Sequence, residues 1–104
     1  MGRNNKRELA NRLAVLITHL LKWQFQSKKR SDSWVSTIVT QRRQIEVLLE
    51  DNPSLKYGIE IVIAKEFIRA SIQFEKEARI DKKTLPKACP YTWEQLSDYD
   101  FMPK

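Results

Sequence analysis

Apolar side chains recur at helical spacing through most of this chain of 104 residues. Between residues 5 and 26, six leucines and isoleucines fall on one side of a helix and form a continuous apolar stripe. They are Leu9, Leu13, Leu16, Ile17, Leu20 and Leu21. The chain holds only two glycines, and no Asn-Gly or similar signal joins two strand-like runs. The sequence therefore predicts an all-α fold.

Polar and proline-containing segments interrupt this apolar pattern. They divide the chain into predicted helices over residues 5–26, 32–51, 54–79 and 93–97. Asn4 or Asn5 is expected to cap the first helix, and Ser31, Asp32 and Ser33 compete to cap the second. The short basic turn between them predicts an antiparallel hairpin. The fold is thus three main helices plus a short C-terminal one.

The third and fourth helices have clear start signals. Asn52 is expected to cap the third, with Pro53 at its first position. Thr92 and Gln95 form a capping-box pattern for the fourth. The third helix is apolar on several sides, so we expect it to be central or shared with a partner.

Composition narrows the class of protein. The length predicts one domain, residues 1–104. One cysteine cannot form an intramolecular disulfide, and 41% hydrophobic residues is too high for a disordered tail. No apolar run approaches the ~20 residues of a membrane span, and no signal peptide is visible. We therefore expect a cytoplasmic protein that does not contact membranes.

The net charge of +6 is unevenly distributed. Residues 1–43 contain ten basic and two acidic residues, whereas residues 44–104 are nearly neutral. Such asymmetry is typical of contact with an anionic partner. An ordinary solvated basic face is the competing interpretation.

Basic and aromatic residues gather around the expected hairpin turn. The candidate binding residues are Lys22, Trp23, Lys28, Lys29, Arg30, Trp34, Arg42 and Arg43. Lysine and arginine neutralise phosphates or carboxylates, and exposed tryptophans stack on bases. Alternatively, Trp23 and Trp34 pack on each other as core, which is the simpler interpretation and the one we favour.

Catalytic and metal-binding patterns are weak. His19 is the only histidine, lies beside the apolar stripe and has no acid or nucleophile at local spacing, so we expect a packing role. Cys89 has no second cysteine for a zinc site, and only the fold could bring it beside His19 as a nucleophile–base pair. Glu46 and Glu50 lie one turn apart, but a solvated face explains them. We predict no catalytic residue, no metal and no cofactor, and lean against an enzyme.

Several motifs give the chain a family resemblance. They are Lys6 to Leu13, His19 to Gln24, Ser33-Trp34, Thr37-Ile38, Gln41 to Arg43, Asn52 to Leu55, Cys89 to Thr92 and Gln95-Leu96. Together they resemble the bacterial, largely cyanobacterial, family catalogued as domain of unknown function 29. The resemblance implies an all-helical fold and assigns no activity.

The resemblance also implies a further N-terminal segment, about forty residues long and ending in an acidic helix, that precedes the position matched by Gly2 and Arg3. Without such a helix, apolar surface would be uncovered in a domain of this size. We therefore expect a homodimer formed by helix-on-helix packing.

Two functions fit the sequence. The first is a protein-interaction or oligomerisation module that uses the basic aromatic hairpin to bind an acidic partner or the N-terminal segment that the resemblance implies. The alternative is a nucleic-acid-binding domain that uses the same face.

Overall fold

The computed structural model describes residues 2–104, with side chains from residue 5 onward. In chain order the elements are the helices α1 (Gly2–Phe25), α2 (Asp32–Asp51), α3 (Ile59–Ala78) and α4 (Trp93–Ser97), with 3-10 turns η1 (Ser27–Lys29), η2 (Pro53–Lys56) and η3 (Lys82–Thr84) between them. The described residues contain no strand, which confirms the all-α prediction.

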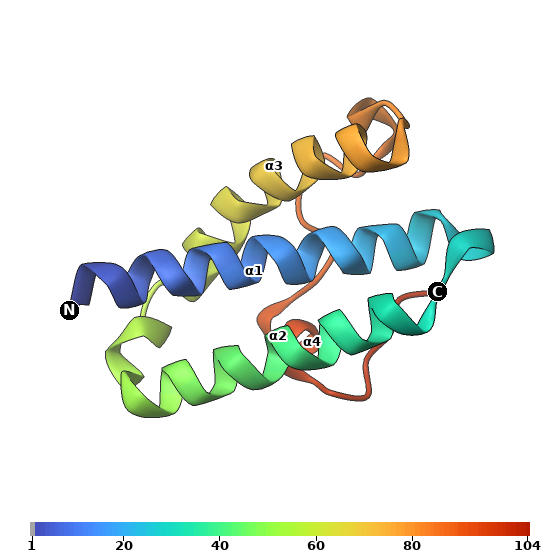
Figure 1. The fold of residues 1–104 in the computed structure, drawn as a ribbon. Coiled ribbons are helices and arrows are strands. Elements are labelled where there is room, and N and C mark those ends of the chain that lie inside the picture. The colour runs from blue at the N-terminus through green and yellow to red at the C-terminus, as the bar shows by residue number, and fades with distance from the viewer. Residues whose placement is uncertain (1) are drawn as a thin grey trace.

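Helix α1 is the centre of the fold (Figure 1). It lies between α2 and α3, and it runs antiparallel to α2, as the hairpin prediction required. After α3 the chain passes behind α1 in the view of Figure 1. It then reaches α4, which packs against α2. Helix α4 also contacts α3, and η3 lies beside it, so α3 is covered by α1 and by the C-terminal segment.

The predicted apolar stripe of α1 lies at the centre of the hydrophobic core. All six of its members are at most 2% exposed. Helices α2 and α3 face it with their own apolar side chains, chiefly Ile38, Ile45, Leu48, Ile63, Phe67 and Phe74. Burying one leucine or isoleucine side chain stabilises a fold by about 1.5–3 kcal/mol, so this stripe supplies much of the driving force for folding.

Two helix starts agree with the sequence in detail. The Ser31 Oγ accepts a hydrogen bond from the Trp34 N–H, so Ser31 caps α2. Both bonds of the capping box are present at α4, where Thr92 and Gln95 exchange side-chain and backbone hydrogen bonds. These bonds satisfy N–H groups that the first turn of a helix leaves unpaired.

The predicted start of the first helix is wrong. Helix α1 already includes Gly2, so Asn4 and Asn5 lie inside it and do not cap it. The Asn5 Nδ2 instead donates to Asn52 Oδ1 at 3.0 Å and links α1 to the end of α2.

The predicted start of the third helix is also wrong. Pro53 opens the 3-10 turn η2, and α3 begins only at Ile59. The break is made by Gly58, which has a left-handed φ of 71° and is the N-cap of α3. Asn52 ends α2, since its N–H donates to the Leu48 carbonyl.

Candidate interaction surface

The hairpin turn places six of the eight predicted residues at one end of the α1–α2 pair, namely Lys22, Trp23, Lys28, Lys29, Arg30 and Trp34. Arg30 folds back over the end of α1, where its Nε donates to the Trp23 carbonyl at 2.8 Å. Its guanidinium lies 4.7 Å from the centroid of the Trp23 ring. A cation at this distance from an indole is attracted by the ring face. Arg30 therefore stabilises the turn while remaining exposed.

Lys22 joins all three long helices at the same end. Its Nζ forms an ion pair with Glu77 of α3 and lies 5.4 Å from the centroid of the Trp34 ring on α2. Burial alone would raise the pKa of Glu77, but hydrogen bonds from Lys22 and Gln73 outweigh it and hold that pKa below its usual value. The Lys22 charge is thus already neutralised within the chain.

Trp23 and Trp34 are both half-buried. Among the described aromatic side chains, the ring pairs are Phe25 with Phe74 and Tyr91 with Phe101, so the two tryptophans do not form such a pair with each other. Each instead carries a cation above its ring, Arg30 on Trp23 and Lys22 on Trp34.

The exposed cations of the turn are Lys28, Lys29 and Arg30, which we call the basic tip. The ion pairs between described side chains are Glu8–Arg12, Lys22–Glu77 and Glu66–Arg69, so no carboxylate neutralises the tip within this part of the chain. Phe25, three residues before Lys28 at the end of α1, is 38% exposed, and its ring packs edge-to-face against Phe74 of α3. Positive charge and apolar surface therefore occur together at the tip.

Arg42 has a different environment from the tip. It is only 3% exposed, and its Nε and Nη2 donate to the carbonyls of Leu96 and Gln95 at 2.8 and 3.0 Å. Burial lowers the pKa of Arg42. Arg42 therefore holds α4 against α2, whereas its neighbour Arg43 is exposed.

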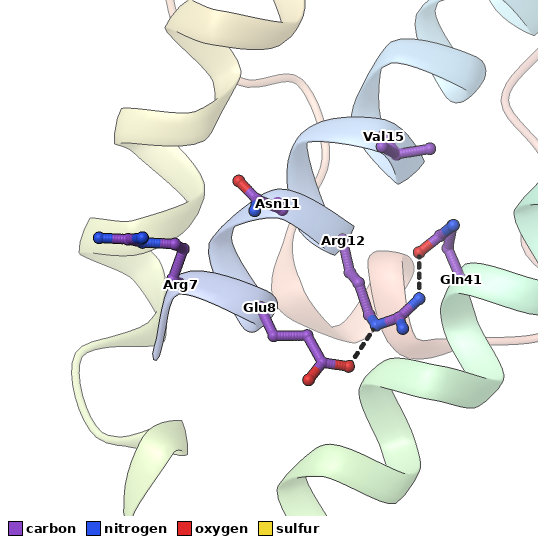
Figure 2. Close-up of a pocket in the computed structure, with 6 residues that line it drawn as sticks. All are labelled: Arg7, Glu8, Asn11, Arg12, Val15 and Gln41. Atoms are coloured by element: carbon purple, nitrogen blue, oxygen red, sulfur yellow. Dashed lines mark hydrogen bonds and ion pairs between the residues drawn. The ribbon is translucent and has the colours of Figure 1, made fainter. Parts of the chain in front are cut away.

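A second polar cluster lies where α1 faces α2, in a pocket of about 430 Å³ (Figure 2). The Arg12 Nε donates to Glu8 Oε2 at 2.8 Å, and its Nη1 donates to Gln41 Oε1 at 3.2 Å. Arg7 points away from this pair, as Figure 2 shows. Arg12 thus cross-links the two helices of the hairpin, a role that the sequence did not single out.

His19 lies in another pocket, of about 470 Å³, between α1 and α3. Its Nδ1 donates to the Val15 carbonyl at 2.8 Å, and burial is the main cause that lowers its pKa. Glu77 also lines this pocket, so the fold provides the acid that local spacing did not. Cys89 is not among the lining residues, and burial raises the pKa of its thiol. The fold therefore does not bring His19 and Cys89 into one pocket.

No cluster of three or more histidine, cysteine or carboxylate side chains in residues 2–104 is arranged to hold a metal ion. None of the helices in this range combines the length and the apolar character needed to cross a membrane.

Comparison with known proteins identifies the family. The model of one family, Domain of unknown function DUF29, matches residues 1–102. The chain belongs to this family. No curated protein and no solved structure matches it in the corresponding searches. Membership of the DUF29 family confirms the resemblance seen in the sequence and assigns no activity.

The structure also shows a surface in this DUF29 member that the candidate residues did not include. The outward side of α3 and the turn before it expose Tyr57, Ile61, Ile68 and Ile72, and Tyr57 and Ile61 are 87% and 74% exposed. The signal in the sequence was the third helix's apolar character on several sides, which indicated a shared helix without naming its face.

Proposed function

We propose that this chain is a protein-interaction module that binds an acidic protein segment through its basic tip and associates with a second copy of itself through helix-on-helix packing. The observation that carries the first part is the combination of unneutralised Lys28 and Lys29 with the partly exposed Phe25 at the end of α1. An acidic peptide with one apolar side chain complements such a surface in both charge and hydrophobicity.

The arrangement around the tip favours a peptide over nucleic acid. Lys22 is paired with Glu77, Arg42 is buried against α4, and Trp23 and Trp34 are half-buried under cations. Of the eight candidate residues, the four exposed cations Lys28, Lys29, Arg30 and Arg43 therefore remain to neutralise phosphates, and neither tryptophan has an open ring to stack on bases. Nucleic-acid binding needs several phosphate contacts to reach useful affinity at physiological salt.

Nucleic-acid binding is the second candidate function. The exposed Arg43 on α2, together with Lys28, Lys29 and Arg30, supports it because backbone recognition requires only positive charge. The two functions differ in how strongly salt weakens binding, since each phosphate neutralised releases counterions.

A binding experiment on the full chain tests these alternatives. The probes are a fluorescent peptide of alternating glutamate and leucine and a single-stranded oligonucleotide of equal charge, each titrated at several salt concentrations. We expect the peptide to bind and the variant Lys28→Glu/Lys29→Glu to lose binding. The matched control is Lys82→Glu/Lys83→Glu, which makes the same charge change at an exposed turn elsewhere.

The outcomes separate the functions. Loss of peptide binding only in the tip variant supports the proposal. Tight binding of the oligonucleotide alone, with a steep fall in affinity as salt rises, favours the nucleic-acid function. Equal loss in both lysine variants contradicts a specific role for the tip.

A further inference from the structure

A pocket of about 450 Å³ lies between the second half of α2, the turn η2 and helix α4. This volume is within the range of roughly 300–1,000 Å³ that is typical of small-molecule sites. We call it the α2–α4 pocket. Its main lining residues are Arg42, Ile45, Glu46, Leu49, Glu50 and Trp93. No residue of the basic tip lines it, so it is a separate site.

One side of the α2–α4 pocket is a polar ridge on α2. Arg42, Glu46 and Glu50 follow one another at a spacing of four residues, which places side chains on the same side of a helix, one turn apart. Glu46 and Glu50 are exposed, and neither forms an ion pair with a described side chain. The Tyr99 hydroxyl donates to Glu46 Oε1 at 3.1 Å, which positions this carboxylate and leaves its Oε2 as an acceptor. The ridge therefore offers carboxylate oxygens to an ammonium group.

Arg42 lies at the buried end of this ridge and has an unused hydrogen-bond donor. Its Nε and Nη2 donate to two carbonyls of α4, and these two nitrogens form one edge of the planar guanidinium. The N–H bonds of Nη1 point away from that edge. Nη1 is buried and has no hydrogen-bond partner among the described atoms. A buried donor without an acceptor is unfavourable, and a carboxylate is the strongest acceptor for a guanidinium.

The rest of the pocket lining is largely apolar. Ile45 and Leu49 come from the adjacent side of α2, Pro53 comes from η2, and Trp93 and Leu96 come from α4. Trp93 is half-buried, so part of its surface is still exposed. An aromatic or branched aliphatic group packed against these side chains removes apolar surface from water. The pocket therefore favours a ligand with a large apolar side chain.

We propose that the α2–α4 pocket binds a free α-amino acid with a large apolar side chain. The ligand carboxylate lies at the Arg42 end, its ammonium group lies at Glu46, and its side chain packs against Trp93. An α-amino acid carries both charged groups on one carbon atom, which suits two ridge residues that are one helical turn apart. The charged lining residues are two cations, Arg42 and Lys56, and two carboxylates, Glu46 and Glu50. A zwitterion without net charge complements this lining.

Titration of the full ¹⁵N-labelled chain with L-phenylalanine at millimolar concentrations tests the site by NMR. The chain has three tryptophans, so three indole N–H signals report on three places. We expect the Trp93 signal to shift and reach saturation, while the signals of Trp23 and Trp34 stay in place. The variant Trp93→Phe identifies the Trp93 signal. A titration that leaves the Trp93 signal in place overturns the proposal.

Changes to the ligand test the role of Arg42 without disturbing the contact between α2 and α4. Phenethylamine lacks the carboxylate of phenylalanine, and 3-phenylpropionate lacks its ammonium group. We expect each to bind about tenfold more weakly than L-phenylalanine, because each loses a hydrogen bond between charged groups. Binding of phenethylamine as tight as that of L-phenylalanine would contradict the contact with Arg42. Equally tight binding of 3-phenylpropionate would contradict the contact with Glu46.

A protein variant tests the contact with the ammonium group. Glu46→Gln should weaken binding of L-phenylalanine about tenfold and leave binding of 3-phenylpropionate unchanged, since that ligand has no ammonium group. The matched control is Glu60→Gln, which removes an exposed carboxylate of α3 outside the pocket and should change neither affinity. Equal losses for both ligands in Glu46→Gln would overturn the ammonium contact. Peptide binding at the basic tip enters none of these measurements, so the two proposals can fail independently.

Discussion

Arg42 of α2 donates through its Nε to the Leu96 carbonyl of α4 at 2.8 Å, and both residues are buried. A second bond from Nη2 reaches the Gln95 carbonyl. The Leu96 carbonyl lies at the end of a five-residue helix, where the backbone leaves carbonyls without intrahelical donors, and the Gln95 carbonyl also accepts from the Asp98 N–H. One arginine side chain therefore satisfies the end of α4 and fixes its position.

Replacing Arg42 by methionine should destabilise the fold by about 1–3 kcal/mol, because the buried Leu96 carbonyl loses its donor and the Gln95 carbonyl keeps only the Asp98 N–H. Urea unfolding followed by tryptophan fluorescence measures this loss. Arg43→Met is the control, since Arg43 is exposed, and it should change the free energy of unfolding by less than about 0.5 kcal/mol. Equal effects of the two changes would contradict a structural role specific to Arg42.

Gly58→Ala should destabilise the fold by about 1–2 kcal/mol, because residue 58 has a φ of 71° that disfavours any side chain. No atom lies within 4 Å of the position that a Cβ would occupy, so the change measures backbone strain alone. Thermal unfolding is the measurement.

Arg79 provides the converse test. It ends α3 with a φ of 59°, so Arg79→Gly should stabilise the fold by up to about 1 kcal/mol. A neutral result for Gly58→Ala would show that residue 58 can adopt another backbone conformation.

Stability should fall as the pH falls through 6.5, because His19 resists protonation in the folded chain. Burial lowers its pKa below 6.5, so in this range the unfolded chain binds the proton more readily. Urea unfolding between pH 5 and pH 8, analysed for the wild type and His19→Gln, measures this dependence. The dependence should be weaker in His19→Gln, and an identical pH profile in both proteins would contradict the assignment.

Glu77→Gln should destabilise the fold by at most about 1 kcal/mol, since its carboxylate is partly exposed. Its pKa is held below 4.5, so its contribution is present above that pH and is lost as the pH falls further. The difference in unfolding free energy between Glu77→Gln and wild type should therefore shrink below pH 4.5. A difference that persists there would point to packing rather than charge.

Local sequence patterns were sufficient to predict those features of the helices that depend on neighbouring residues alone. The α1 stripe and the cap at Thr92 depend on residues within one or two turns and were predicted correctly, and Ser31 was one of three adjacent candidates for the cap of α2. The start of α3 was missed because Pro53 is an equally good start for a 3-10 turn. The competing signal, Gly58, carries information only through its backbone conformation.

The burial and the pairing of the candidate residues could not be predicted from local sequence patterns. Arg42 and Arg43 are adjacent and chemically identical, yet one is buried against a helix 54 positions away and the other is exposed. The pairing of Lys22 with Glu77 likewise joins residues 55 positions apart. Helical spacing assigns a side to each residue but does not reveal what a later segment places there.

The crossing of the chain from α3 to α4 has a consequence for the order of folding. The α1–α2 hairpin closes a turn of a few residues, whereas the bond from Arg42 to Leu96 closes a loop of 54 positions. Long loops cost more entropy to close, so the hairpin should form first and the C-terminal segment should dock last. The same segment should then be the first to open, and its amides should exchange with solvent faster than those of α1.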